Sequence, residues 1–168
     1  QYDYLGSLVA HKKGIGPKVL LTGHIDEIGF CVKEITEDGY LRVHPLGGWN
    51  TRNMMAEPVT ITTREGKKLP GIIGTDPKPG WPRDKAIPME DVYVDLGVAS
   101  KQEALDLGIH IGDPITPKAE FMVMNNPKYV NAKAWDDRVG AAIVTDVMRN
   151  MAGKTLACDL YCAGTVQE

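Results

Sequence analysis

The residues best suited to chemistry begin at His24, which follows the apolar run Val19–Gly23 and precedes Asp26 by two positions. Such a run is typical of a strand buried on both faces in a parallel or mixed sheet, and open α/β sheets bind ligands beyond the carboxyl ends of their strands. An imidazole there can bind a metal ion through one ring nitrogen, while a carboxylate bonded to the other fixes the tautomer. His24 and Asp26 are therefore candidates for a metal ligand and its orienting partner, with an ordinary strand-end turn as the alternative.

A second candidate is the acidic pair Asp136-Asp137, which opens a predicted helix after Trp135. One interpretation is an N-cap with favourable charge at the positive end of the helix dipole. The other is a carboxylate held at a sheet edge, where it can bridge two cations. The pair alone leaves both interpretations open.

The third candidate is Glu168, which follows the predicted strand Leu156–Gly164. Solvated strand ends often carry Glu, so this residue alone decides little. Three segments with a residue able to bind a metal or act as a base would, however, converge at one edge of the same sheet. Their combination favours a metal-dependent active site over three independent coincidences.

The middle of the chain has a different character from its two ends. Residues 45–127 consist of short β-rich runs broken by turn residues, and Pro58–Thr63 and Lys68–Ile73 flank one such turn. One helix begins at Ser100 and ends at Gly108. This segment is predicted to be a separate small β-barrel or sandwich.

After residue 134 a helical pattern returns, and Gly153 ends it. The apolar residues recur at intervals of three and four: Val139, Ala142, Ile143, Val147 and Met151. The order strand, inserted β-domain, helix, strand predicts an α/β fold. We expect a mixed-sheet domain, residues 1–44 and 128–168, interrupted by a small β-barrel-like domain, residues 45–127.

Three segments closely resemble, in the same order, the metal-site segments of the glutamyl-aminopeptidase and deblocking-aminopeptidase family: His24–Asp26, Ala134–Gly140 and Gly164–Glu168. That family includes the self-assembling tetrahedral aminopeptidases, and it also interrupts its catalytic α/β domain with a β-domain between the first two motifs. The resemblance covers nearly the whole chain. It implies a metallopeptidase-type catalytic domain in a metal-dependent aminopeptidase, an exopeptidase hydrolase that removes N-terminal residues from peptides.

By that resemblance His24 is a ligand of one metal ion, Asp26 orients it, and Asp136 bridges two metal ions. Glu168 is the general base that activates the shared water. The Asp136-Asp137 peptide bond is expected to be cis. The family's other three ligands, a Glu directly after the base and an Asp and a His farther along, have no counterpart in this sequence. The chain is therefore interpreted as incomplete and, by itself, as inactive.

Cofactor and partners follow from the same resemblance. Two divalent cations are implied, and the ligand types suit zinc or cobalt first and manganese second. A peptide substrate and a homo-oligomer built through the inserted β-domain are also implied. The net charge of −3 and pI of about 5.8 give no electrostatic reason to bind nucleic acid.

Composition places the chain among globular proteins, with 43% hydrophobic and 24% charged residues. No apolar stretch approaches the ~20 residues that cross a bilayer, and the first residues lack a signal-peptide pattern. A cytoplasmic protein without a membrane partner is therefore predicted. Cys31, Cys158 and Cys162 are interpreted as reduced core thiols.

Two alternatives remain at this point. Relatives with this scaffold have been labelled as cellulases, and paired carboxylates also serve glycoside hydrolysis, although a His-containing site argues against it. The second alternative is a non-catalytic assembly module around residues 45–127 that accepts a peptide by strand addition. Loss of activity on chelation would exclude the first, and peptide binding without the His24 and Asp136 segments would favour the second.

Overall fold

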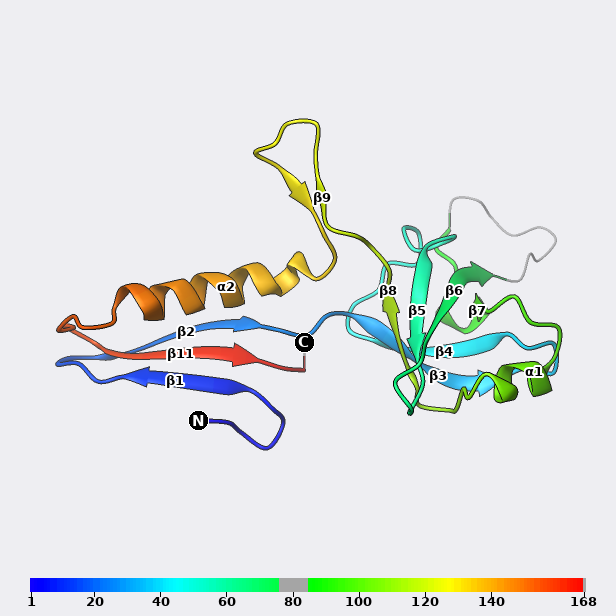
Figure 1. The fold of residues 1–168 in the computed structure, drawn as a ribbon, viewed down its shortest axis with the longest axis horizontal. Helices are drawn as coiled ribbons and strands as arrows, with labels where there is room; N and C mark the ends of the chain where they lie inside the picture. Colours follow the sequence, from blue (N-terminus) through cyan, green and yellow to red (C-terminus); the bar gives the residue numbers. More distant parts are fainter. Residues whose placement is uncertain (76–84, 168) are drawn as a thin grey trace. The chain divides into compact units, whose positions relative to one another are not determined.

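The computed structural model describes residues 1–75 and 85–167, which form two compact units (Figure 1). One unit contains Gln1–Glu27 and Ala134–Glu168, and we call it the α/β unit. The other contains Ile28–Lys133, and we call it the barrel unit. The first unit is thus built from two distant parts of the chain.

The α/β unit is organised around a three-stranded sheet with the order β1-β11-β2. Its strands are β1 (Leu8–Lys12), β11 (Asp159–Thr165) and β2 (Lys18–His24). The central strand β11 is antiparallel to β1 and parallel to β2. Because β2 and β11 run in the same direction, their carboxyl ends meet at one edge of the sheet.

The helix α2 (Trp135–Asn150) packs on one face of this sheet (Figure 1). Val144, Leu160 and Cys162 form the centre of the contact, and Val19 and Leu21 pack around them. On the opposite face Leu20 is 62% exposed. The prediction that this strand is buried on both faces is therefore wrong for the described part of the chain, because α2 covers only one of them.

Gly23 allows β2 and α2 to approach closely. A Cβ atom at this position would lie 2.5 Å from the backbone nitrogen of Ala141 and 2.6 Å from the carbonyl carbon of Gly140. Real Cβ atoms essentially never approach other atoms so closely. The absence of a side chain at Gly23 therefore sets the distance between the carboxyl end of β2 and the first turn of α2.

The barrel unit is a closed six-stranded barrel with the order β3-β4-β7-β6-β5-β8. Its strands are β3 (Gly29–Ile35), β4 (Leu41–Leu46), β5 (Pro58–Thr62), β6 (Lys68–Thr75), β7 (Val92–Asp95) and β8 (Pro114–Pro117). Two short helices, η1 (Met89–Asp91) and α1 (Lys101–Asp106), lie in its connections. Alternate side chains such as those of Phe30, Leu41 and Ile61 point inward and are fully buried. The prediction of a barrel-like inserted domain within an α/β fold is confirmed.

The observed division of the chain differs from the predicted boundaries after residues 44 and 127. The hairpin β3–β4 was expected to belong to the α/β domain, but β3 pairs with β8 and β4 pairs with β7. Both strands contribute side chains to the barrel core. The barrel unit therefore begins at Ile28 and extends to Lys133.

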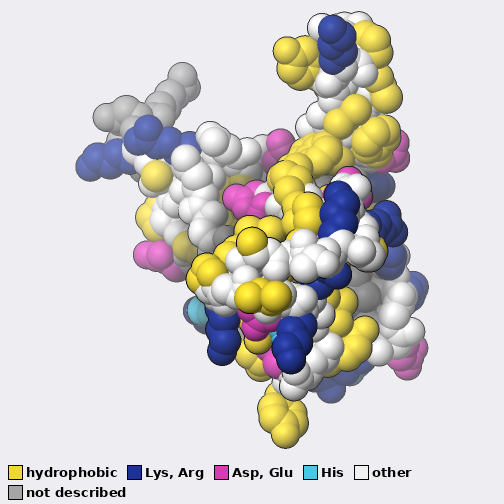
Figure 2. Space-filling view, turned by 90° about the vertical axis from the view of Figure 1, so that its left-hand side faces the viewer, with side chains coloured by type: hydrophobic (Ala, Val, Ile, Leu, Met, Phe, Trp, Pro, Cys, Tyr) yellow, Lys and Arg dark blue, Asp and Glu magenta, His cyan; other side chains and the backbone are white. Residues whose placement is uncertain are grey.

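A short hairpin near the end of the barrel unit exposes many apolar side chains. It consists of β9 (Met122–Val123) and β10 (Val130–Asn131). The side chains of Phe121, Met122, Val123 and Tyr129 are each more than half exposed, and hydrophobic atoms dominate this hairpin at the upper right of Figure 2.

No helix within residues 1–75 and 85–167 is both long enough and apolar enough to span a membrane. The three cysteines are free thiols; Cys162 is buried, whereas Cys31 and Cys158 are only partly buried.

Candidate metal centre

His24 is the last residue of β2 and lies at the carboxyl edge of the sheet. Its partner in the parallel register is Thr165, the last residue of β11. One residue later the Ile25 N–H donates to the Thr165 carbonyl at 2.8 Å. The two strand exits are therefore held side by side, as the sequence predicted.

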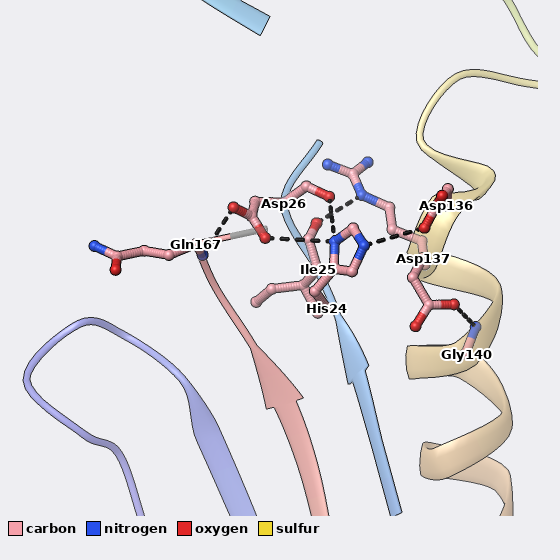
Figure 3. A network of polar contacts seen from close by, with 8 residues as sticks. His24, Ile25, Asp26, Asp136, Asp137, Gly140 and Gln167 are labelled. Atoms are coloured by element: carbon pink, nitrogen blue, oxygen red, sulfur yellow. Dashed lines mark hydrogen bonds and ion pairs between the residues drawn. The ribbon is translucent and has the colours of Figure 1, made fainter. Parts of the chain in front are cut away.

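The imidazole of His24 faces the carboxylate of Asp136 (Figure 3). Nε2 of His24 and Oδ1 of Asp136 are 3.1 Å apart, although the residues are 112 positions apart in the sequence. The His24 side chain is 20% exposed and that of Asp136 is 94% exposed. The contact thus opens to solvent on the carboxylate side, where a ligand can approach.

The other ring nitrogen of His24 contacts Asp26. Nδ1 lies 3.2 Å from the backbone carbonyl oxygen of Asp26 and 3.6 Å from its Oδ1. A carbonyl can only accept, so Nδ1 carries the proton, and the neutral ring then has its lone pair on Nε2. This is the tautomer that a metal ion bound at Nε2 requires. The orienting contact predicted for the Asp26 carboxylate is therefore made at shorter distance by the backbone of the same residue.

The surroundings raise the pKa of His24 above its ordinary value. Burial by itself lowers this pKa, but the hydrogen bond to Asp136, the Asp26 carbonyl and the charges of both carboxylates together outweigh it. A proton on Nε2 bonds to the Asp136 carboxylate. The same position can be taken by a cation, because the lone pair and the carboxylate both favour positive charge between them.

The Asp26 carboxylate has a second function in the fold. Its Oδ2 accepts a hydrogen bond from the backbone N–H of Gln167 at 2.9 Å. This contact joins the segment after β11 to the segment after β2 (Figure 3). Gln167 therefore helps to position the sheet edge, although nothing in its residue type indicated this.

Asp137 adopts a different role from its neighbour. Its Oδ1 accepts a hydrogen bond from the Gly140 N–H at 3.0 Å, the geometry of an N-cap three residues before the donor. Asp136 and Asp137 both have non-helical backbone angles, and the peptide bond between them is cis, as predicted. The regular helix therefore begins at Arg138, with Asp137 as its cap and Asp136 directed to His24.

Arg138 adds a link that sequence reasoning missed. Its Nε donates to the Ile25 carbonyl oxygen at 2.9 Å and so ties the start of the helix to the residue after His24. The sequence could have indicated this residue, because Arg138 directly follows the acidic pair Asp136-Asp137 in the family-like segment Ala134–Gly140.

Glu168, the predicted general base, lies outside the described residues.

The residues present fit a divalent cation as two of its ligands. An imidazole nitrogen and a carboxylate oxygen suit zinc and similar ions, and two ligands with bonds near 2.1 Å lie roughly 3.0–3.4 Å apart around one cation. The observed separation of 3.1 Å falls in this range. Within residues 1–75 and 85–167, however, no group of three or more His, Cys, Asp or Glu side chains is placed to hold a metal ion. Among the described residues, His24 and Asp136 are thus the two candidate ligands of one cation.

Residues 6–168 match the M42 glutamyl aminopeptidase family. The chain is 35% identical over 175 residues to the glutamyl aminopeptidase of Lactococcus lactis subsp. cremoris, and the match covers 100% of this chain and 49% of that protein.

Among solved structures, the TET aminopeptidase of a marine sediment archaeon of the Thaumarchaeota superposes with a TM-score of 0.90 at 36% identity, covering 100% of this chain and 49% of that one. The TET1 peptidase of Pyrococcus horikoshii, which can assemble into a tetrahedron or a large octahedral shell, gives a TM-score of 0.81 at 34% identity, with coverage of 100% and 51%. The chain spans about half the length of the relatives it matches.

Proposed function

The chain belongs to the M42 glutamyl aminopeptidase family, and from that premise we propose that it is part of a metal-dependent aminopeptidase that removes N-terminal residues from peptides. The observation that carries the proposal is the 3.1 Å approach of His24 and Asp136 at the sheet edge. Because the chain covers about half of its relatives, the peptide substrate belongs to the complete enzyme. The chain by itself is proposed to be inactive.

His24 is proposed as a ligand of one cation and Asp136 as the carboxylate that bridges two. Asp26 keeps the His24 ring in the tautomer that leaves Nε2 free to coordinate, chiefly through its backbone carbonyl. Zinc or cobalt suits this nitrogen and oxygen pair best, with manganese also accommodated. When bound, two divalent cations would polarise the scissile carbonyl and lower the pKa of the attacking water.

Glu168 is proposed as the general base, on the strength of its place in the Gly164–Glu168 segment. Its carboxylate takes the proton from the attacking water and later gives it to the leaving amine.

The barrel unit is proposed to carry the contacts of a homo-oligomer. The assembly of the Pyrococcus horikoshii TET1 peptidase supports this for a relative of similar fold. The exposed apolar side chains of the β9–β10 hairpin are consistent with burial in an assembly, because large exposed apolar patches usually mark interaction sites.

The two alternative functions are less well supported. Glycoside hydrolysis needs two carboxylates that flank the scissile bond, but of the adjacent acids Asp136 and Asp137 the second is occupied as a helix cap. Peptide binding by strand addition needs a free sheet edge, and the six strands of the barrel form a closed circle.

The test is a calorimetric titration of the chain with Co²⁺ or Zn²⁺. His24→Ala and Asp136→Asn should each abolish or greatly weaken binding, whereas His44→Ala, on the exposed part of β4, should bind as the parent does. Equal binding by all four proteins would refute the assignment of the site. In the complete enzyme, chelation should remove peptidase activity and metal should restore it.

A further inference from the structure

A pocket of about 350 Å³ opens on the surface of the barrel unit, and none of the residues assigned above lines it. Its lining includes Trp49, Asn50, Asn53, Met54, Glu57 and Val59. Its volume is at the lower end of the roughly 300–1,000 Å³ typical of small-molecule sites, and such sites occur at the mouths of barrels. The pocket lies entirely within Ile28–Lys133 and does not depend on the proposed peptidase site.

The apolar part of the pocket is built from the packed core of the barrel. Met54, Val59 and Ile73 belong to the buried barrel core and are at most 2% exposed. The Trp49 ring stacks on Phe30 with centroids 4.3 Å apart, and its Nε1–H donates to the Gly29 carbonyl at 2.7 Å. The aromatic wall is thus fixed before any ligand arrives, which reduces the entropy lost on binding.

The polar part of the pocket carries a single charge, that of Glu57. The backbone of Glu57 is held at both ends, since its N–H donates to the Met54 carbonyl and its carbonyl accepts from the Ile73 N–H. The Glu57 side chain forms no hydrogen bond or ion pair with any other part of residues 1–75 and 85–167. Its carboxylate is therefore available to a ligand, on a backbone that is held in place.

The carboxamides of Asn50 and Asn53, which line the pocket with Glu57, help to define the kind of group that it can bind. Oδ1 of Asn50 already accepts the Arg52 N–H at 3.1 Å, whereas the Asn53 carboxamide lines the pocket and can accept through its oxygen. A carboxylate and an amide oxygen together match a group with several N–H donors and positive charge, and a primary ammonium has three. The aromatic and aliphatic walls match an apolar group attached to it.

We propose that this pocket binds a small ligand in which an aromatic or aliphatic group carries a primary ammonium. A free amine and the N-terminal residue of a peptide share this chemistry. The interaction is favoured by the charge of Glu57, so it weakens as the ionic strength rises.

The test is an NMR titration of the intact chain with phenethylamine, followed at the Trp49 indole N–H and the Met54 methyl group. Both signals should shift in a saturable manner. The neutral analogue 2-phenylethanol has nearly the same shape without the positive charge, and it should bind at least about tenfold more weakly, since a hydrogen bond to a charged group contributes roughly 1.5–3 kcal/mol.

Two variants localise the effect. Glu57→Gln should weaken phenethylamine binding at least about tenfold and leave the spectrum of the fold intact, because residue 57 is exposed. Glu65→Gln removes an exposed charge at the β5–β6 turn of the same barrel and should bind as the parent does.

The proposal is overturned if the amine and the alcohol bind equally, if Glu57→Gln binds like the parent, or if the shifts fall outside the pocket.

A further experiment uses L-phenylalaninamide, which mimics a peptide N-terminus. Binding at least as tight as that of phenethylamine assigns the site to peptide N-termini, and clearly weaker binding assigns it to free amines. Either result supports the shared ammonium chemistry, and neither depends on metal or peptidase activity.

Discussion

Asp137 accepts a hydrogen bond from the Gly140 N–H at 3.0 Å and so caps the helix that begins directly after it. Its neighbour Asp136 is consequently left outside the helix with its carboxylate 3.1 Å from the imidazole of His24. The sequence offered capping and metal binding as competing interpretations of one acidic pair. In the structure Asp137 makes the capping contact with Gly140, and Asp136 makes the contact with the His24 imidazole.

The first prediction separates these roles by mutation. Asp137→Ala should lower the free energy of unfolding by about 1 kcal/mol, the usual value of a lost N-cap. Asp136→Ala should change it by less than about 0.5 kcal/mol, because the side chain is 94% exposed, yet it should lose cation binding. Urea unfolding and calorimetric metal titration are measured for both variants. If the variant that loses more stability also loses more metal binding, the proposed division of roles between Asp136 and Asp137 is contradicted.

The second prediction concerns the close contact between β2 and α2. Gly23→Ala places a methyl carbon 2.5 Å from the backbone nitrogen of Ala141, so the helix must move, and overpacking of this kind costs roughly 1–3 kcal/mol. The displacement should also weaken metal binding, because Asp136 precedes that helix. Gly48→Ala is the control, since a Cβ atom there meets nothing within 4 Å; comparable destabilisation of both variants would show that the contact with α2 is not responsible.

The third prediction is a pH dependence at the other end of the sheet. Hydrogen bonds from His11 at 2.8 Å and from the Gly14 N–H at 3.2 Å lower the pKa of Asp159 below its ordinary 3.8, although burial acts in the opposite direction. A lowered folded-state pKa stabilises the fold above the unfolded value and loses this effect as the pH falls through the folded one. Asp159→Asn should therefore reduce stability at pH 7, and its difference from the parent should shrink below pH 3.8. Urea unfolding at several pH values measures this, and a difference that grows in acid would exclude the mechanism.

The fourth prediction tests the proposed base in a complete enzyme that contains this chain. Glu168→Gln keeps nearly the same shape, so metal content and KM should change little. The kcat should fall at least ~10²–10⁴-fold, the usual contribution of a positioned general base. Hydrolysis of an aminoacyl-p-nitroanilide gives both constants, and near-normal turnover at full metal occupancy would assign the proton transfer to another group.

The parts of the site that could be predicted follow from periodicity and strand direction. An apolar run before His24 and a second strand before Glu168 suffice to bring two strand exits to one edge, provided that the strands are parallel, and β2 and β11 are. Backbone contacts could not be predicted in this way. The Asp26 carbonyl on His24 and the Gln167 N–H on Asp26 depend on how the chain turns after each strand, and residue types do not encode such turns.

The missed elements of the barrel have a similar explanation. The strand β8 reads Pro114-Ile115-Thr116-Pro117, and proline usually argues against a strand. Here the prolines stand at its two ends, and fully buried Ile115 pairs with Phe30 of β3 and Ile61 of β5. Without this strand the barrel does not close, so the hairpin β3–β4 could not be assigned to it from sequence.

The insertion of the barrel unit between β2 and α2 also determines the order in which the site can form during synthesis. Asp136 leaves the ribosome 112 residues after His24, which corresponds to about 6–22 s at translation rates of roughly 5–20 residues per second. The barrel unit ends at Lys133, so its whole sequence has been synthesised before Asp136 is, and domains generally fold as units. Until β11 follows, β2 lacks its parallel partner among the described strands, and its unpaired edge is available to chaperones or to incorrect pairing on the nascent chain.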